Sequence, residues 1–341
     1  MRIVSGPERV DYDEFGLFHE NASEFALPYD RPPSVRRTAV EIEPGRSLSA
    51  LVWGDGEPEL VLLHGGEQNA HTWDTVAMAL RPRPLVAIDL PGHGHSGGPG
   101  LQQVAGAGPR AAATDIAVAV RALAPAADAV VGMSFGGVTA LALADQDPEL
   151  VRRLVLVDVF PGLAPERSRH IAEFVAGPAT FASFDDLFAR TKGFNPDRTD
   201  SSLRRGILHN AQQLPDGTWV WRHSRWRIDR PEEAARYEES LIRALDIASG
   251  DPDDPVEATM PATPGGPTFG ELLDAARRLT VPTMLARGMR PDSVLRDDDE
   301  ERFLETVPGG VVRRFPDAGH SIQGDMPIEL AAAIAELAPH S

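Results

Sequence analysis

The sequence predicts an α/β protein whose core is a mostly parallel sheet wrapped by helices and interrupted by an inserted helical segment. The first observation is that short apolar stretches alternate with helical patterns from residue 38 to about 160, as strands and crossover helices do in parallel sheets. The second is that this alternation stops after Phe160 and resumes near residue 280. A chain of 341 residues is long enough for two domains, or for one large domain with an insertion.

The first part of the predicted core is read from apolar periodicity and turn residues. Residues 38–43 and 48–53 alternate as half-buried strands do, and the turn-forming stretch 54–58 follows them. Residues 59–63 form a continuous apolar run, which is typical of a strand covered on both faces. The next predicted elements are a helix at 73–80, a strand at 84–89, a helix at 108–124, a strand at 128–133, a helix at 137–145 and a strand at 152–158.

The rest of the chain divides into an arm, an insertion and the return of the core. Residues 1–37 carry scattered aromatic side chains, which indicates an irregular arm on the surface rather than a domain. Residues 162–280 hold helical segments and a loop at 248–270 that is rich in Pro, Gly and Asp. The core is therefore predicted at 38–161 and 281–341. Its last elements are a strand at 279–288, a helix at 297–307, a strand at 309–315 and a helix at 328–337.

The composition excludes several classes of function. The sequence has no cysteine, so thiol nucleophiles, iron–sulfur clusters, cysteine-based zinc sites and disulfides are ruled out. With 33 basic and 51 acidic residues the net charge is −18, which would repel a nucleic acid. No apolar run approaches the ~18 residues of a membrane span. We recognise no secretion signal, so we expect a cytoplasmic protein with neither a nucleic-acid nor a membrane partner. The oligomeric state stays open.

The strongest chemical motif is Gly132-Met133-Ser134-Phe135-Gly136, which lies between a predicted buried strand and a predicted helix. Gly-x-Ser-x-Gly in a strand–turn–helix setting is the pattern of a nucleophile elbow. The turn is so sharp that small residues are needed two positions before and after the serine. The motif therefore predicts that Ser134 stands exposed above the sheet as a nucleophile, at the N-terminus of a helix whose amides favour negative charge.

A second motif, LVLLHGG at residues 60–66, ends an earlier strand. Small residues there allow the backbone N–H of Gly66 to approach a reacting carbonyl group, and we predict that it forms an oxyanion hole with the N–H of Phe135. One neighbour opposes this role. Glu67 follows directly, and its carboxylate would repel a developing oxyanion unless it points to solvent.

The third motif, PDAGHSIQGD, contains His320 just after the last predicted strand. A single histidine is more often structural than catalytic. Here, however, the histidine lies in a glycine-containing turn and follows the serine in the chain, which is the order expected when a serine, an acid and a histidine act together on such a sheet. In that role His320 takes the proton of Ser134 and delivers it to the leaving group.

Together with DLPGHGHSG at residues 89–97, these motifs resemble those of the α/β-hydrolase fold superfamily, over about 38–160 and 280–341. The resemblance implies a mostly parallel eight-stranded sheet flanked by helices and an active site covered by a helical cap formed by 162–280. The reaction would need no cofactor and no metal. His93 and His95 could in principle ligate a metal, but the sequence places no third ligand beside them.

The acid of the predicted triad has two candidates. Most of the superfamily takes it from the loop after the penultimate strand, which here offers Asp292. A minority takes it from the end of the strand after the nucleophile helix, which here offers Asp158. We favour Asp158, because it ends an apolar run, where a carboxylate without a partner would be costly. Asp292 lies in a polar, acid-rich stretch.

Three side chains of the insertion are candidates for substrate binding. Trp219 and Trp221 are two residues apart, so in a strand they share a face; they belong either to the core of the cap or to a pocket. His209 is a weaker candidate of the same kind. An enclosing cap with aromatic residues suggests a small or medium, partly apolar small-molecule substrate.

The sequence thus predicts a serine hydrolase that cleaves a carboxylic ester or a lactone. A carbon–carbon bond hydrolase, and a hydrolase-fold enzyme with non-hydrolytic chemistry in a biosynthetic pathway, use the same scaffold and remain alternatives. A non-catalytic binding protein would be expected to have lost Ser134, His320 or the acids. The arginine-rich, lysine-poor composition suggests a bacterial source.

Overall fold

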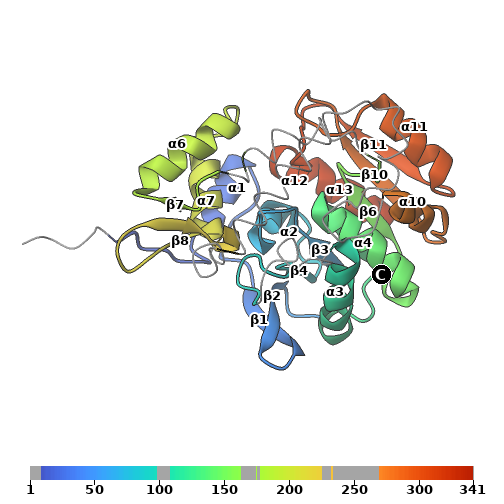
Figure 1. Cartoon of the computed structure of the whole chain (residues 1–341), viewed down its shortest axis with the longest axis horizontal. Helices are drawn as coiled ribbons and strands as arrows, with labels where there is room; N and C mark the ends of the chain where they lie inside the picture. The colour runs from blue at the N-terminus through green and yellow to red at the C-terminus, as the bar shows by residue number, and fades with distance from the viewer. Residues whose placement is uncertain are drawn as a thin grey trace, which may run out of the picture.

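The computed structural model describes residues 9–97, 108–162, 174, 177–224, 232 and 269–340. Its centre is an eight-stranded sheet with the order β1-β2-β4-β3-β5-β6-β10-β11 (Figure 1). β1 and β2 are antiparallel to their neighbours, and all the other pairs are parallel. The strands are β1 (Val35–Glu43), β2 (Arg46–Trp53), β3 (Leu60–Leu63), β4 (Leu85–Ile88), β5 (Ala129–Met133), β6 (Leu154–Val157), β10 (Thr283–Gly288) and β11 (Val311–Phe315). The predicted mostly parallel sheet is confirmed.

Helices cover both faces of this sheet, as the apolar runs of its central strands require. β3, β4, β5 and β6 are buried along their whole length. One apolar core packs the sheet against α3 (Pro109–Leu123), α4 (Phe135–Gln146), α10 (Phe269–Arg277) and α11 (Asp297–Thr306). The other packs it against α1 (Phe18–Glu24), α2 (Asp74–Ala79), α12 (Ile322–Asp325) and α13 (Pro327–Leu337). Short 3-10 turns lie at Ala70–Trp73 (η1), Pro148–Leu150 (η3) and Arg222–Ser224 (η5).

The inserted segment is not helical throughout. Its described part contains α6 (Phe184–Phe194) and α7 (Asp200–Asn210) and also a small antiparallel sheet, ordered β7-β9-β8. The three strands are only two or three residues long, too short for a pattern to indicate them: β7 (Thr180–Phe181), β8 (Ala211–Gln213) and β9 (Trp219–Trp221). These elements lie beside α1, at the end of the molecule away from α10 and α11 (Figure 1). The predicted loop at 248–270 lies outside the described residues up to 268.

Two boundaries of the core differ from those expected. The N-terminal arm is not only a surface feature, because α1 buries Phe18, whose ring lies 5.0 Å from that of Trp53. The core resumes before residue 281, since α10 packs Leu272, Ala275 and Ala276 into the same apolar cluster as α3 and α4. Among the described residues, no helix has both the length and the apolar character needed to cross a membrane.

Candidate active site

The predicted chemical residues follow neighbouring parallel strands. β3, β5, β6 and β10 are hydrogen-bonded side by side, so their carboxyl ends meet at one edge of the sheet. Loops at this edge are where α/β sheets build their sites. Gly66 follows β3, Ser134 follows β5, and Asp158 follows β6 directly.

Ser134 occupies the sharp turn that the sequence predicts. It lies between β5 and α4 with φ 50° and ψ −119°, a conformation that L-residues rarely adopt. A Cβ atom at Gly132 would overlap the carbonyl oxygen of Gly136, and one at Gly136 would overlap the backbone of Leu63 at the end of β3. The turn therefore admits only glycine at both positions. The Ser134 side chain is half-buried, at the N-terminus of a helix of 12 residues.

His320 is held by Asp158. The imidazole Nδ1 lies 3.0 Å from Oδ2 of Asp158, although the two residues are 162 positions apart in the sequence. The carboxylate is fully buried, and Asp158 has φ 47°. It also accepts hydrogen bonds from the Gly288 N–H, the Ser293 hydroxyl and the Val294 N–H, at 3.0, 2.7 and 3.1 Å. These donors offset the cost of removing a carboxylate from water.

Asp292, the other candidate acid, is exposed. Its carboxylate lies against Gly319, where an added Cβ would collide with it. The contacts of the described residues give Asp292 no hydrogen bond to His320, whereas Asp158 has one. The structure therefore brings Asp158 and His320 together and leaves Asp292 beside the histidine's loop.

The loop after β3 passes beside the serine. A Cβ built on Gly65 would lie 3.4 Å from Cβ of Ser134, so Gly66, the predicted oxyanion donor, is in the turn that follows. This turn is closed by the Gln68 N–H, which donates to the Gly65 carbonyl at 3.3 Å. Phe135, the second predicted donor, is the first residue of α4 and directly follows Ser134.

We expected the Glu67 carboxylate to be compatible with an oxyanion hole only if it pointed to solvent. It does not point to solvent. Its carboxylate Oε2 lies 2.7 Å from Nε2 of His223, in η5, and is largely covered. The backbone of Glu67 is left-handed, with φ 63°, and its carbonyl accepts a hydrogen bond from Asn210 at 2.5 Å. Two residues of the inserted segment therefore hold this loop, and the carboxylate is directed to an imidazole.

His64 directly follows β3 and precedes the loop that carries Gly66. It is completely buried; Nδ1 lies 2.7 Å from the Gly65 carbonyl and Nε2 accepts from the Leu90 N–H at 2.9 Å. Burial lowers the pKa of His64 to about 3, so the ring is neutral at pH 7. A neutral ring fits both hydrogen bonds, because one nitrogen donates and the other accepts.

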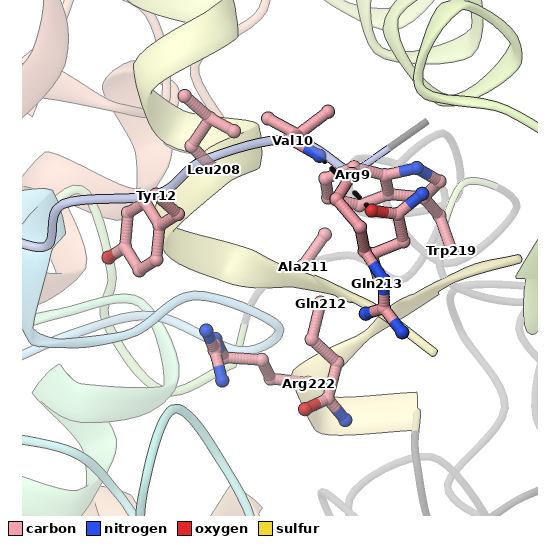
Figure 2. A pocket seen from close by; sticks show the side chains of 9 residues that line it. All are labelled: Arg9, Val10, Tyr12, Leu208, Ala211, Gln212, Gln213, Trp219 and Arg222. Atoms are coloured by element: carbon pink, nitrogen blue, oxygen red, sulfur yellow. Dashed lines mark hydrogen bonds between the residues drawn. The ribbon is translucent and has the colours of Figure 1, made fainter. Parts of the chain in front are cut away.

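The three substrate-binding candidates of the insertion are buried. Trp219 and Trp221 are both on β9 and belong to an apolar cluster with Phe181, Leu187 and Ile207. Trp219 also lines a cavity of about 150 Å³ between the chain at Arg9–Tyr12 and β8–β9 (Figure 2). Ser134 and His320 are not among the residues lining this cavity. His209 is buried at the end of α7 and contacts Tyr12 through Nδ1, at 2.8 Å.

Several residues around the site were missed by the sequence interpretation. Ser293 and Gly288 support Asp158, while Asn210 and His223 hold the loop after β3. Each acts on a residue far away in the chain; the Ser293–Asp158 pair, for example, spans 135 positions. No local pattern marks such residues, because serine, asparagine and histidine are ordinary in polar loops.

Comparison with known proteins places this chain in a family. Residues 58–327 match the model of the alpha/beta hydrolase fold family, and the chain therefore belongs to it. The predicted fold and the prediction of a hydrolase-fold enzyme are confirmed.

The chain is similar to an esterase over nearly its whole length. It is 34% identical over 331 residues to the esterase Rv0045c of Mycobacterium tuberculosis (strain ATCC 25618 / H37Rv), and the match covers 95% of each protein. A crystal structure of that esterase has a TM-score of 0.73 and 33% identity, and the match covers 96% of this chain and 99% of that one. A second structure, with the same TM-score, is titled for the transition metal inhibition of that esterase. A pimeloyl-[acyl-carrier protein] methyl ester esterase of Pectobacterium carotovorum is 34% identical over 174 residues, 47% of this chain and 65% of that protein.

Proposed function

We propose that this protein is a serine hydrolase that cleaves a small to medium carboxylic ester or lactone through an acyl-enzyme on Ser134. The observation that carries the proposal is the 3.0 Å contact between His320 Nδ1 and Asp158 Oδ2, at the sheet edge that also presents Ser134. With Nδ1 held by a carboxylate, Nε2 of His320 is the nitrogen left to accept the serine proton.

The reaction follows from these roles. Ser134 Oγ attacks the ester carbonyl as its proton passes to Nε2 of His320, and Asp158 stabilises the resulting imidazolium. The N–H groups of Gly66 and Phe135 stabilise the oxyanion. His320 then protonates the leaving alcohol, and the acyl group stays on Ser134. Water, deprotonated by His320, attacks the acyl-enzyme, releases the acid and restores the serine.

Asp158 is the acid in this proposal, because it is fully buried and accepts four hydrogen bonds, one of them from His320. A carboxylate held in this way keeps the histidine in one tautomer and one orientation. Asp292, which is exposed, lacks that support.

The substrate class rests on the relatives and on the insertion. The long match to an esterase and the shorter match to a methyl ester esterase both support ester cleavage. We assign the inserted segment that precedes α10 as a cap, since Asn210 and His223 of this segment contact the loop after β3 beside Ser134. A cap so close to the nucleophile favours a compact substrate over a polymer.

The test is hydrolysis of p-nitrophenyl acetate and butyrate, combined with fluorophosphonate labelling and mass spectrometry. The wild type should release p-nitrophenol and carry the label on Ser134, and Ser134→Ala should do neither. Ser23→Ala, which changes an exposed serine, is the matched control and should behave as the wild type. A wild type that neither hydrolyses the esters nor takes the label contradicts the proposal. Labelling without hydrolysis of any ester would favour carbon–carbon bond hydrolysis or non-hydrolytic chemistry.

A further inference from the structure

A group of metal-ligating side chains lies outside the proposed catalytic residues, where the core, the insertion and the N-terminal segment meet. It consists of His71 in η1, Asp74 at the start of α2 and His209 at the end of α7. Nδ1 of His71 lies 2.9 Å from Oδ2 of Asp74, and Nε2 of His209 lies 3.8 Å from the same oxygen. The three donor atoms are within 4.8 Å of one another, and all three residues are buried.

The outer nitrogen of each imidazole already has a partner. Nε2 of His71 lies 3.0 Å from Oε1 of Glu14, and Nδ1 of His209 lies 2.8 Å from the Tyr12 hydroxyl. Each ring therefore turns its other nitrogen toward Asp74. Hydrogen bonds to the outer nitrogen are what orient histidine ligands in metal sites and fix their tautomer.

One polar atom of this group is without a partner. Asp74 is 1% exposed, and its buried Oδ1 has no hydrogen-bond partner among the residues that the structure describes. A buried acceptor left in this state is unfavourable, because it has lost its hydrogen bonds to water without gaining another. Both imidazole nitrogens face the other oxygen, Oδ2, so a cation held by both carboxylate oxygens of Asp74 would give Oδ1 a partner as well.

We propose that His71, Asp74 and His209 bind one divalent transition-metal ion of the Zn²⁺ type. Two imidazole nitrogens and a carboxylate suit Zn²⁺, Co²⁺, Ni²⁺ or Cu²⁺, whereas Mg²⁺ and Ca²⁺ prefer all-oxygen sites. The ion takes the place of the proton between His71 Nδ1 and Asp74, and that proton leaves to solvent.

Binding requires one rotation. The two rings are stacked with centroids 3.8 Å apart and planes 12° apart, so their nitrogen lone pairs lie in two nearly parallel planes. One imidazole must turn about its Cβ–Cγ bond before both nitrogens meet the same ion. The nearby guanidinium of Arg37 does not oppose the ion with a free charge, because it is paired with Asp89, at 2.8 Å, and with Glu14.

The proposal is tested on the full chain with the metal alone. Co²⁺ titration followed by visible absorption should show one equivalent bound with the bands of an N/O-coordinated ion, and Zn²⁺ calorimetry should give the same stoichiometry. His209→Gln and Asp74→Asn should abolish this binding. Tyr12→Phe, which keeps all three ligands, should weaken it about 10–100-fold. His19→Gln, which alters an exposed histidine, is the control and should bind as the wild type does.

Two results would overturn the site. One is a wild type that binds no stoichiometric Co²⁺ or Zn²⁺; the other is equal affinity in the wild type, His209→Gln and Tyr12→Phe, which would place the metal elsewhere. Circular dichroism of each variant separates lost ligands from lost folding, and Tyr12→Phe still decides the matter if a ligand variant does not fold. None of these measurements depends on ester hydrolysis.

Discussion

At the scale of single residues, Asp158 shows how a buried charge is made tolerable. Its carboxylate is completely covered, yet each oxygen accepts two hydrogen bonds, from two backbone N–H groups, one hydroxyl and one imidazole. Hydrogen bonds to an ionised acceptor are about twice as strong as neutral ones, which offsets the desolvation. Its backbone is left-handed here, and three of the four donors belong to the end of β10 and the chain that follows it.

Replacing this carboxylate tests its role. Asp158→Asn should lower kcat for p-nitrophenyl butyrate about 10³–10⁴-fold, because the amide can no longer hold His320 in the tautomer that accepts the serine proton. Asp292→Asn, the matched change at the neighbouring exposed position, should keep most of the activity. Steady-state kinetics on both variants decide between the two acids. A large loss in Asp292→Asn with a mild loss in Asp158→Asn would reverse the assignment.

His64 predicts a pH dependence of stability. Its pKa is about 3 in the folded protein, because it is buried, and near 6.5 when unfolded. The unfolded chain therefore takes up the proton first, so this contribution to stability is full above pH ~6.5 and is lost as the pH falls toward 3. The free energy of unfolding falls by ~1.4 kcal/mol for each pH unit in this range.

The measurement is urea unfolding at a series of pH values between 6.5 and 5, where most carboxylates are still ionised. In His64→Gln the free energy of unfolding should be lower at pH 7, since one hydrogen bond is lost, but should fall less steeply with decreasing pH. His93 is also buried with a lowered pKa, so in the wild type and in His64→Gln alike it makes the free energy of unfolding fall as the pH falls. If the free energy of unfolding depends on pH equally steeply in the wild type and in His64→Gln, His64 is not the group that titrates.

At the scale of elements, the turn from β5 to α4 is dictated by close packing. Gly132 and Gly136 sit where the strand, the helix and the end of β3 touch through backbone atoms, which cannot move aside as a flexible side chain can. The strained backbone of Ser134 is held in place by this packing.

Alanine at these glycines should be costly. Gly132→Ala should lower the free energy of unfolding by about 1–3 kcal/mol or more, because the new methyl group overlaps the Gly136 carbonyl. Gly206→Ala is the control: Gly206 lies inside α7 with no neighbouring atom within 4 Å of an added Cβ, so alanine there should stabilise the protein by up to ~1 kcal/mol. Urea denaturation of both variants measures the difference. A harmless Gly132→Ala would mean that the turn can relax.

The inserted segment also reaches the loop that carries Gly66. Asn210 donates to the Glu67 carbonyl and accepts from Asn69, so one side chain at the end of α7 spans the loop. Asn210→Ala should lower kcat about tenfold with little change in KM, less than the 10²–10³-fold loss of an oxyanion donor itself. Asn195→Ala, at the end of α6, is the matched control. A raised KM with unchanged kcat would instead point to substrate binding.

At the scale of the whole molecule, the sequence predicts what is local and misses what is distant. The core strands are predicted by apolar runs, and the turn at Ser134 by the small residues on either side of it. Both are patterns of a few neighbouring positions. The apolar run before Asp158 favours this residue over Asp292, but the groups that hold its carboxylate lie more than 100 residues away, where no local pattern can indicate them. The His71–Asp74–His209 group assembles from segments with no shared motif. β7, β8 and β9 are too short to show a period.

The partners of Asp158 have a consequence for synthesis on the ribosome. The residues that hold its carboxylate, from Gly288 to His320, are translated after the whole insertion, the last of them 162 codons later. At about 5–20 residues per second, roughly 8–30 s pass between the two ends of that contact. For most of this interval β6 lacks its neighbour β10, and the carboxylate of Asp158 has water in place of its protein partners, beside an open strand edge. The enzyme is therefore assembled only when the C-terminal quarter has left the ribosome, and the half-made sheet is the stage at which a chaperone has most to protect.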